Sequence, residues 1–286
     1  MTDILFLILV IVSILLLWLM IYDTNRFVTI TYTVSDKRIQ KDFRAVLLAD
    51  LHNKSFGKDN EALIAAIDGL QPEMILVAGD MLTAKPGVDF EVAMDLMQRL
   101  SGKYPIYYGN GNHEYRAGIY PEKYGDMHEK YIKGLKELEI QPLINESVRL
   151  EEYGVCIYGL EIDRKYYKRF RRPHMSVEYL ESVLGQADDD AYGLLLAHNP
   201  EYFEAYAKWG ADLVLSGHVH GGMVRVPFWG KGVLSPNVSF FPKYDGGSFS
   251  LGTSRMLLSR GLGTHTIPIR LFNPGELVCI DFRRAD

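Results

Sequence analysis

Residues 212–222 read DLVLSGHVHGG, and this stretch guides the interpretation of the whole chain. An apolar run over 213–215 ends at Ser216-Gly217, and His218 and His220 follow with one residue between them. In an extended backbone alternate side chains lie on the same face, so both imidazoles can enter one site. A single His-x-His pair is weak evidence for a metal, because two ordinary surface or core histidines give the same pattern. The pattern gains weight only if further ligands converge on it.

Four other apolar runs end in the same way, at residues 49, 78, 108 and 197, with polar side chains just beyond each end. Short, nearly continuous apolar runs are typical of strands that are buried on both faces. Open α/β sheets bind ligands at the carboxyl ends of such strands. The sequence therefore predicts that side chains from five strands meet at one edge. The candidates are Asp50, His52, Asp80, Asn112, His198, His218 and His220.

These side chains predict a binuclear metal centre. Asp, His and Asn ligands without a thiolate suit Mn²⁺, Zn²⁺ or Fe²⁺ rather than a structural zinc site. The set is too large for one tetrahedral ion, but it fits two divalent ions that share a bridging carboxylate. Two such ions can activate a hydroxide and hold the oxygens of an in-line phosphoryl displacement.

The same residues form ordered blocks that resemble a known family. The chain resembles the calcineurin-like metallophosphoesterases in blocks that occur in the family's order: Asp50-x-His52, Gly79-Asp80, Gly111-Asn112-His113-Glu114, His198 and Gly217-His218-x-His220. Residues 259–264 and 269–274 also resemble a membrane-associated bacterial branch that includes enzymes cleaving UDP-2,3-diacylglucosamine. The resemblance covers nearly everything after residue 40. It implies an α/β fold of two stacked mixed β-sheets flanked by helices.

The resemblance also implies a role for each residue of the site. One ion would be bound by Asp50, His52, Asp80 and His220, and the other by Asp80, Asn112, His198 and His218. Asp80 would therefore bridge the two ions. His113 would be catalytic without binding metal, either by protonating the leaving oxygen or by steadying the phosphate. Glu114 would orient the His113 ring or lie in solvent, and the sequence leaves both alternatives open.

Residues 4–22 form an uncharged apolar segment that is interrupted only by Ser13. A helix of this length, at ~1.5 Å rise per residue, spans about 28 Å and can cross a bilayer's hydrocarbon core. The leader has no basic residue, and residues 19–23 offer no small-x-small cleavage site, which favours an uncleaved anchor over a signal peptide. The sequence therefore predicts a membrane anchor at 1–26, with a transmembrane helix at about 4–22, and one metallophosphoesterase domain at 27–286.

The charges around the anchor predict its orientation. Lys and Arg flank the helix only on its C-terminal side, so the positive-inside rule predicts a single-pass protein of the cell membrane with its domain in the cytoplasm. The net charge of −5 argues against a general nucleic-acid binder, which would carry a basic face. Nothing in the sequence indicates the oligomeric state.

The remaining patterns concern the thiols and the C-terminal part. Cys156 and Cys279 lie in apolar runs, which favours buried free thiols over a disulfide. Alternating and apolar stretches predict strands at 222–226, 248–259, 269–272 and 277–282.

Two further segments are candidates for substrate or membrane contacts. Residues 165–172 read KYYKRFRR, and Arg169 and Arg172 are candidates for binding a substrate phosphate. The segment could equally contact anionic lipid head groups or be a solvated loop. Phe228-Trp229 and Phe240-Phe241 could form an apolar lip beside the metals, with Trp229 on the substrate, but ordinary packing is the favoured interpretation.

Together these features predict a two-metal-dependent phosphohydrolase that cleaves a phosphoester or pyrophosphate bond by means of a metal-activated hydroxide. The anchor favours a lipid-linked or nucleotide-lipid substrate, and a phosphodiesterase acting on a soluble small molecule is the alternative. A non-catalytic binding scaffold on the same fold would be expected to lose ligands, whereas this sequence keeps the whole set.

Overall fold

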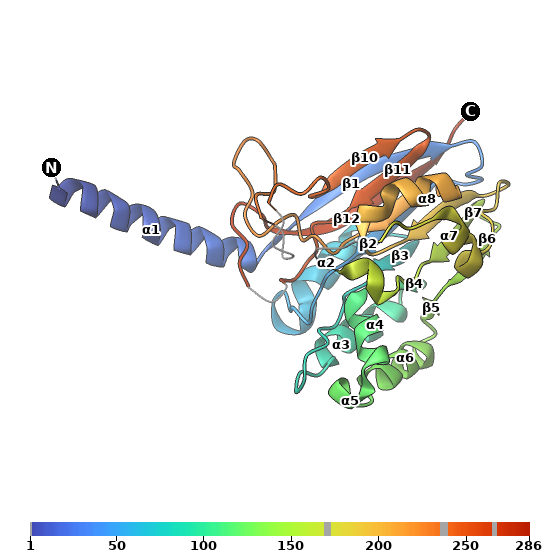
Figure 1. Cartoon of the computed structure of the whole chain (residues 1–286), viewed down its shortest axis with the longest axis horizontal. Helices are drawn as coiled ribbons and strands as arrows, with labels where there is room; N and C mark the ends of the chain where they lie inside the picture. Colours follow the sequence, from blue (N-terminus) through green and yellow to red (C-terminus); the bar gives the residue numbers. More distant parts are fainter. Residues whose placement is uncertain (1, 169–172, 235–239, 265–267) are drawn as a thin grey trace.

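Two six-stranded β-sheets stack face to face, and helices cover their outer faces (Figure 1). The computed structural model describes residues 2–168, 173–234, 240–264 and 268–286. Both sheets contain parallel and antiparallel neighbours. The predicted α/β class with two stacked mixed sheets is therefore confirmed.

The first sheet carries the first half of the site. In spatial order its strands are β1 (Phe27–Asp36), β12 (Gly275–Arg284), β2 (Phe43–Leu48), β3 (Met74–Ala78), β4 (Ile106–Gly109) and β5 (Gln141–Leu143). Its outer face packs against α2 (Glu61–Leu70), α3 (Glu91–Ser101) and α6 (Met127–Glu137). Val46, Ile75 and Val77 point into this outer core because side chains alternate along each strand.

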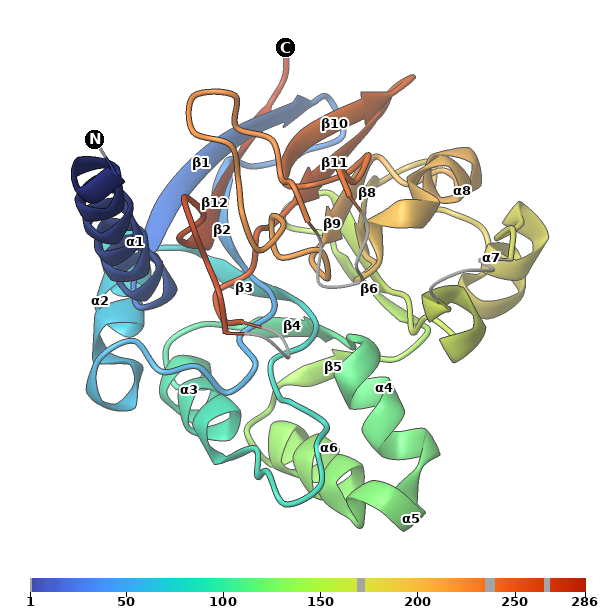
Figure 2. The same cartoon turned by 60° about the vertical axis from the view of Figure 1, so that its left-hand side comes forward.

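The second sheet carries the other half. In spatial order its strands are β10 (Gly247–Leu251), β11 (Ser254–Leu258), β9 (Leu213–Ser216), β8 (Tyr192–Leu196), β7 (Val155–Gly159) and β6 (Glu146–Leu150). Its outer face packs against α7 (Val177–Leu184) and α8 (Phe203–Trp209), as Figure 2 shows. Short elements connect the larger ones: α4 (Asn112–Ile119), α5 (Pro121–Tyr124), and the 3₁₀ turns η1 (Lys58–Asn60), η2 (Arg164–Tyr167) and η3 (Pro200–Tyr202).

The inner faces of the sheets form the central core. Leu47 and Leu76 from the first sheet meet Leu196 and Leu215 from the second, and all four are buried. Burying a leucine side chain contributes about 1.5–3 kcal/mol, so this interface holds the sheets together. The approach is close: a Cβ on Gly109 would lie 2.9 Å from Leu196 Cβ. Both cysteines are buried and free, as the sequence predicts.

Three strand predictions for the C-terminal part are wrong. Residues 222–226 and 269–272 form only isolated bridges, and 248–259 is a hairpin that turns at Gly252 with φ of 59°. The backbone hydrogen bonds explain the first two cases. Arg225 N–H donates to the carbonyl oxygen of Leu271 at 3.0 Å, whereas Met223 N–H donates to that of Leu234 at 2.7 Å. Because the segment divides its backbone bonds between two partners, neither pairing continues as a ladder. The strand predicted at 277–282 is confirmed as part of β12.

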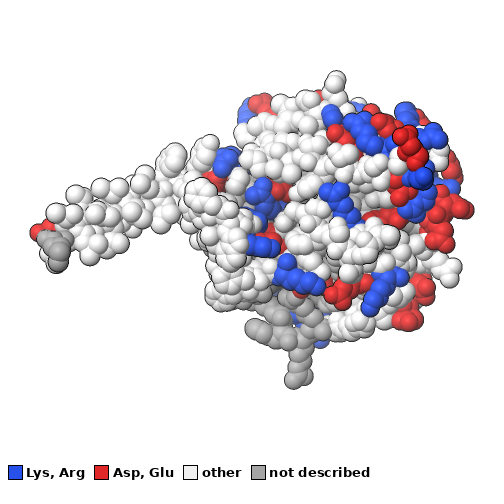
Figure 3. Space-filling view, turned by 90° about the horizontal axis from the view of Figure 1, so that it is seen from above, with Lys and Arg blue, Asp and Glu red and all other residues white. Residues whose placement is uncertain are grey.

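Helix α1 (Thr2–Thr24) projects away from the sheets (Figure 1). By length and composition it could cross a membrane, and its side chains in that span are not buried. Figure 3 shows it as a largely white rod, with acidic side chains in red near its free end and charged side chains again where it joins the domain. An ion pair connects its last turn to the start of the first strand: the buried Asp23 carboxylate lies 2.8 Å from Arg26, the residue before β1.

Candidate metal centre

The candidate ligands lie where parallel strands of both sheets end. The strands β2, β3 and β4 are parallel neighbours in one sheet, and β8 and β9 are parallel neighbours in the other. Their carboxyl ends therefore open toward the same region. The ligands follow these strands directly: Asp50 and His52 after β2, Asp80 after β3, Asn112 after β4, His198 after β8, and His218 and His220 after β9.

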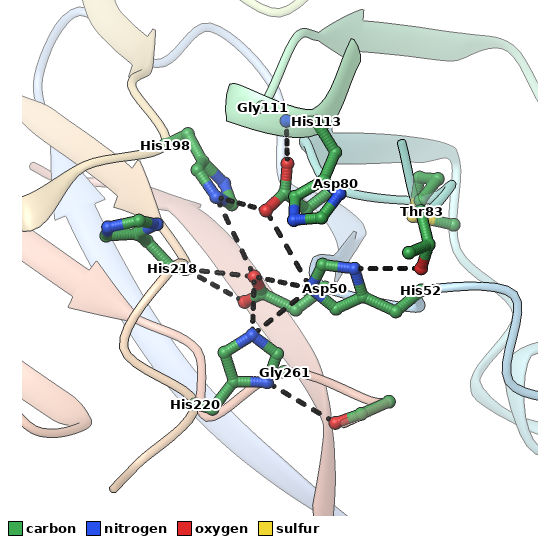
Figure 4. Close-up of polar contacts among 12 residues, drawn as sticks. Asp50, His52, Asp80, Thr83, Gly111, His113, His198, His218, His220 and Gly261 are labelled. Atoms are coloured by element: carbon green, nitrogen blue, oxygen red, sulfur yellow. Dashed lines mark hydrogen bonds and ion pairs between the residues drawn. The ribbon is translucent and has the colours of Figure 1, made fainter. Parts of the chain in front are cut away.

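The carboxylates of Asp50 and Asp80 form the middle of this cluster (Figure 4). Asp50 Oδ1 lies 3.3 Å from His220 Nε2 and 3.7 Å from His198 Nε2. Asp80 Oδ2 lies 3.1 Å from His198 Nε2 and 3.7 Å from His52 Nε2. His52 Nε2 and His220 Nε2 face each other at 3.2 Å. Three groups of ligand atoms, each within 4.8 Å, result: Asp50-His52-His220, His52-Asp80-His113 and Asp80-His198-His218.

The donor set fits a divalent cation. His198 Nε2 and Asn112 Oδ1 are buried and make no hydrogen bond within the described part of the chain. His198 Nδ1 donates to the carbonyl oxygen of Ala78 at 2.6 Å, so the neutral ring turns a lone pair on Nε2 toward Asp80. Two buried acceptors that face each other are unfavourable unless a cation or a proton lies between them.

The electrostatics of the two carboxylates support the same conclusion. Burial opposes a charge on His198, but Asp80 and Asp50 outweigh it and raise its pKa to about 10. Burial raises the pKa of Asp50 to about 7, and the nearby Asp80 carboxylate adds to this effect. Burial also opposes ionisation of Asp80, but His198 and His113 hold its pKa well below its usual range. Without metal, a proton on His198 Nε2 therefore lies between this ring and Asp80, and a bound divalent cation would take the place of that proton.

The backbone of the site is strained. Five of the candidate ligands have φ in the left-handed region: Asp50 at 52°, His52 at 49°, Asp80 at 56°, His218 at 74° and His220 at 53°. For residues other than glycine this region costs of order 1–3 kcal/mol each, and such strain concentrates at functional sites. The surrounding fold must therefore hold these residues in place.

Glycines make room for the two carboxylates. A Cβ on Gly217 would lie 2.5 Å from Asp50 Oδ2, and one on Gly111 would lie 2.2 Å from Asp80 Oδ1. Gly261, with φ of 70°, lies against Asp50 from a third segment. Glycine next to a ligand is therefore a steric requirement of this site.

His113 lies at the edge of the cluster, at the start of α4. Its backbone N–H donates to Asp80 Oδ1 at 2.7 Å, and its ring is packed edge-on to His52 with centroids 4.7 Å apart. Ring Nδ1 accepts the N–H of Ala84 at 2.9 Å and lies 3.1 Å from Arg116 Nη2. Because Nδ1 accepts these donors, the neutral ring carries its proton on Nε2.

Glu114 has a role that the sequence did not reveal. The solvent alternative is wrong, because its carboxylate is fully buried, whereas an orienting role toward the His113 ring stays a prediction. It accepts the backbone N–H groups of Asp80 at 2.9 Å, Met81 at 2.8 Å and Gly111 at 3.0 Å. The Tyr108 hydroxyl also donates to it at 2.9 Å. Glu114 therefore ties together the loops that follow β3 and β4.

We expect Glu114→Gln to destabilise the fold. The carboxamide must place an N–H₂ group against one of these N–H donors, and a buried donor left unsatisfied costs about 1–3 kcal/mol. Urea unfolding followed by tryptophan fluorescence should show this loss. Glu137→Gln, on the exposed end of α6, is the matched control and should leave the unfolding midpoint unchanged. Equal midpoints for both variants would contradict the anchoring role of Glu114.

A cavity of about 390 Å³ opens beside His52 and His113. It is the size of a pocket for a small organic group. Its other lining residues are Thr83, Ala84, Lys85, Pro86, Arg116, Lys123, Tyr124 and Thr264. The segments before α3 and around α4 and α5 thus build one wall of the site, which sequence reasoning missed because none of these residues belongs to a metal-ligand pattern.

The described part of the structure does not place the three predicted substrate-binding residues, Arg169, Arg172 and Trp229, in this cavity. Arg169 and Arg172 lie outside the described residues. Trp229 is 67% exposed and is not among the residues that line this cavity, so its contact with substrate stays a prediction. Phe228, Phe240 and Phe241 are exposed as well, so the favoured interpretation of ordinary packing is wrong for these aromatics.

Residues 43–222 match the sequence model of a protein family, the calcineurin-like phosphoesterases. This chain belongs to that family. The matched region contains every candidate ligand and His113. The predicted family membership is therefore confirmed, whereas the resemblance to the UDP-2,3-diacylglucosamine branch stays a prediction.

Relatives of this calcineurin-like phosphoesterase occur in bacteria and animals. It is 26% identical over 245 residues to an uncharacterized metallophosphoesterase of Helicobacter pylori, covering 84% of this chain and 60% of that one. It is 26% identical over 229 residues to phosphodiesterase YaeI of Escherichia coli, covering 78% and 76% of the two chains. It is also 26% identical over 255 residues to a transmembrane protein with metallophosphoesterase domain of Bos taurus, covering 85% and 53%. The chain thus spans about 60% of the length of the Helicobacter relative.

Among solved structures, a putative 5′-nucleotidase from Staphylococcus aureus is similar to this chain, with 14% sequence identity and a TM-score of 0.48, covering 83% of this chain and 54% of that one.

Proposed function

We propose that this chain is a two-metal-dependent phosphohydrolase that cleaves a phosphoester or pyrophosphate bond. The observation that carries the proposal is the arrangement of buried lone pairs: nitrogen and oxygen acceptors from four strand ends face one another around Asp50 and Asp80. Two divalent ions, Mn²⁺, Zn²⁺ or Fe²⁺, suit these ligands. Asp50, His52, Asp80 and His220 would hold one ion, and Asp80, Asn112, His198 and His218 the other.

Bound divalent ions would supply Lewis acidity at the phosphoryl oxygens and a water of lowered pKa. The other steps fall to the protein. The His113 Nε2–H donates to an oxygen of the reacting phosphoryl group, because Nδ1 is engaged by Ala84. The Ala84 N–H and the Arg116 guanidinium fix the ring orientation. Such preorganised donors stabilise charge that develops in the transition state.

The substrate we favour is membrane-borne, a lipid-linked or nucleotide-lipid phosphoester. The helix α1 supports this choice, and so do the exposed aromatics Phe228, Trp229, Phe240 and Phe241, since large exposed apolar side chains favour contacts with protein or membrane. A soluble phosphodiester is the alternative, and the Escherichia coli relative named a phosphodiesterase favours it.

The test is a hydrolysis screen of the full chain in detergent, stripped with chelator and reloaded with Mn²⁺, Zn²⁺ or Fe²⁺ separately. Bis(4-nitrophenyl) phosphate and nucleotides represent soluble substrates, and a lipid pyrophosphate in mixed micelles represents membrane-borne ones. We expect hydrolysis that depends on added metal and is fastest in the micelles. A chain that binds two metal ions yet hydrolyses no substrate would leave the binding scaffold as the function.

We also propose that residues 1–26 anchor a domain formed by residues 27–286. The flanking cations Arg26, Lys37, Arg38 and Lys41 would keep the domain on the cytoplasmic face of the cell membrane. Lys165 and Lys168 would then meet anionic lipid, where each basic side chain near the surface contributes about 1 kcal/mol.

Protease protection tests this orientation. In bacterial spheroplasts that express the chain, added protease should leave the domain intact until the cells are lysed. Digestion in intact spheroplasts, with a cytoplasmic marker protein still protected, would reverse the orientation.

A further inference from the structure

The cavity beside His113 has a charge pattern that metal binding does not require. Lys85, Arg116 and Lys123 line it, and no aspartate or glutamate is among the described residues of its lining. None of these three cations forms an ion pair within the described ranges of the chain. The cavity therefore presents uncompensated positive charge next to the candidate ligand His52.

Arg116 is held in place for a partner that the chain itself does not provide. Its Nη2 donates to the carbonyl oxygen of Ala84 at 2.9 Å, and its guanidinium carbon lies 5.9 Å from the centre of the Tyr124 ring. Its Nε is buried and makes no hydrogen bond with any residue that the structure describes. The buried Nε stays out of reach of the cavity, but the fixed guanidinium charge beside it attracts an anion there.

The cavity lies next to the residues that would bind metal and contact the phosphoryl group. His52 lines it from the metal side, and His113 lines it from the start of α4. His113 Nδ1 and Arg116 Nη2 are 3.1 Å apart, so the donor expected at the phosphoryl group and the cation of the cavity form one unit. A substrate whose phosphoryl group reaches the metals would extend past His113 into this space.

We propose that Lys85, Arg116 and Lys123 form a subsite for a second anionic group of the substrate, carried by the part that leaves on the His113 side. This inference rests on the proposed phosphohydrolase function. The preferred leaving group then carries its own negative charge, as a phosphate or a carboxylate. The cavity recognises the charge whether its carrier is a soluble molecule or a lipid.

A matched pair of substrates tests the subsite. Methyl 4-carboxyphenyl phosphate and methyl 4-carbamoylphenyl phosphate have the same phosphoryl group and nearly the same shape, but only the first has an anionic leaving group. We expect the full chain, loaded with Mn²⁺, to prefer the carboxylate. Arg116→Gln should lower the ratio of the two kcat/KM values by about tenfold, since a hydrogen bond to a charged group is lost. The double variant Lys85→Gln/Lys123→Gln should lower it by about threefold, because exposed charges contribute less.

Two further measurements separate the possible causes. Lys136→Gln, an exposed lysine of α6 outside the cavity, is the matched control and should keep the wild-type ratio. Hexadecyl esters of the same pair in micelles should show the same ratio, and higher overall rates there would indicate a lipid carrier. Titration calorimetry measures the affinity of the chelator-treated chain for pyrophosphate without turnover. Arg116→Gln should weaken this affinity about tenfold.

The outcomes distinguish this inference from the proposed function. A wild-type ratio in both the Arg116 and the double-lysine variant would overturn the subsite, even if the enzyme is active. No hydrolysis of either ester by the wild type would refute the phosphohydrolase, while loss of pyrophosphate binding in the variants would still support an anion site.

Discussion

Replacing Asp80 by asparagine is expected to remove bound metal and phosphoester hydrolysis together. Asp80 is the one carboxylate expected to contact both ions, and its Oδ2 faces His198 at 3.1 Å and His52 at 3.7 Å. A carboxamide removes the negative charge that offsets two cations and presents one oxygen instead of two. We expect kcat to fall by at least about 10³-fold, because the charge stabilisation in the transition state is lost.

Metal content by mass spectrometry and hydrolysis of bis(4-nitrophenyl) phosphate should be measured on the same preparation. Asp89→Asn, an exposed carboxylate in the loop that follows Asp80, is the matched control and should keep both metal and activity. Full metal content together with normal turnover in Asp80→Asn would refute the bridging role. Loss of metal with a normal far-ultraviolet circular dichroism spectrum would support it, because the fold would then be intact.

Replacing His113 by alanine is expected to remove activity while two metal ions stay bound. The Nε2–H would be lost from the phosphoryl group, and removing one such donor costs about 10²–10³-fold in kcat. The geometry also predicts which of the two roles applies. Protonation of the leaving group would require a proton on Nδ1 before transfer, but Nδ1 accepts the Ala84 N–H and lies beside the Arg116 cation. We therefore expect His113 to steady the phosphoryl oxygens.

The comparison of leaving groups decides between these roles. A steadying donor predicts the same loss for a 4-nitrophenyl ester and for an alkyl ester of the same phosphate. A general acid predicts a loss that shrinks for the nitrophenyl ester, since this leaving group needs no proton. His174→Ala, an exposed histidine, is the control and should behave as wild type. A metal content that drops to one ion in His113→Ala would instead make His113 a ligand, which its distance to His52 and Asp80 allows.

The fold class and the candidate ligands could be predicted because both depend on short-range patterns. Each ligand follows directly on a buried apolar strand, so the strand and the residue beyond it are encoded in the same few positions. Asp50 after β2 and His198 after β8 are examples. Parallel strands then bring these ends together whatever the intervening loops contain.

The errors have a common physical cause. Residues 222–226 alternate as a strand does, but their backbone N–H groups bond to different partners, including Leu234 and Leu271, so no continuous ladder forms. The aromatic pairs at 228–229 and 240–241 resemble core residues by composition, yet they are exposed. In both cases the outcome depends on a long-range contact, or on the lack of a packing surface, that no local pattern contains.

The sequence by itself therefore determined the class of fold, the family and the set of nitrogen and oxygen donors at the strand ends. Only the tertiary structure decided how those donors are used. It placed the Glu114 carboxylate under three backbone N–H groups, put the proton of His113 on Nε2, and set Arg116 beside that ring. The bonds to Asp80, Met81 and Ala84 that fix these features join segments about thirty residues apart in the chain. Such bonds form only when the strands are paired, so their geometry is a property of the folded molecule.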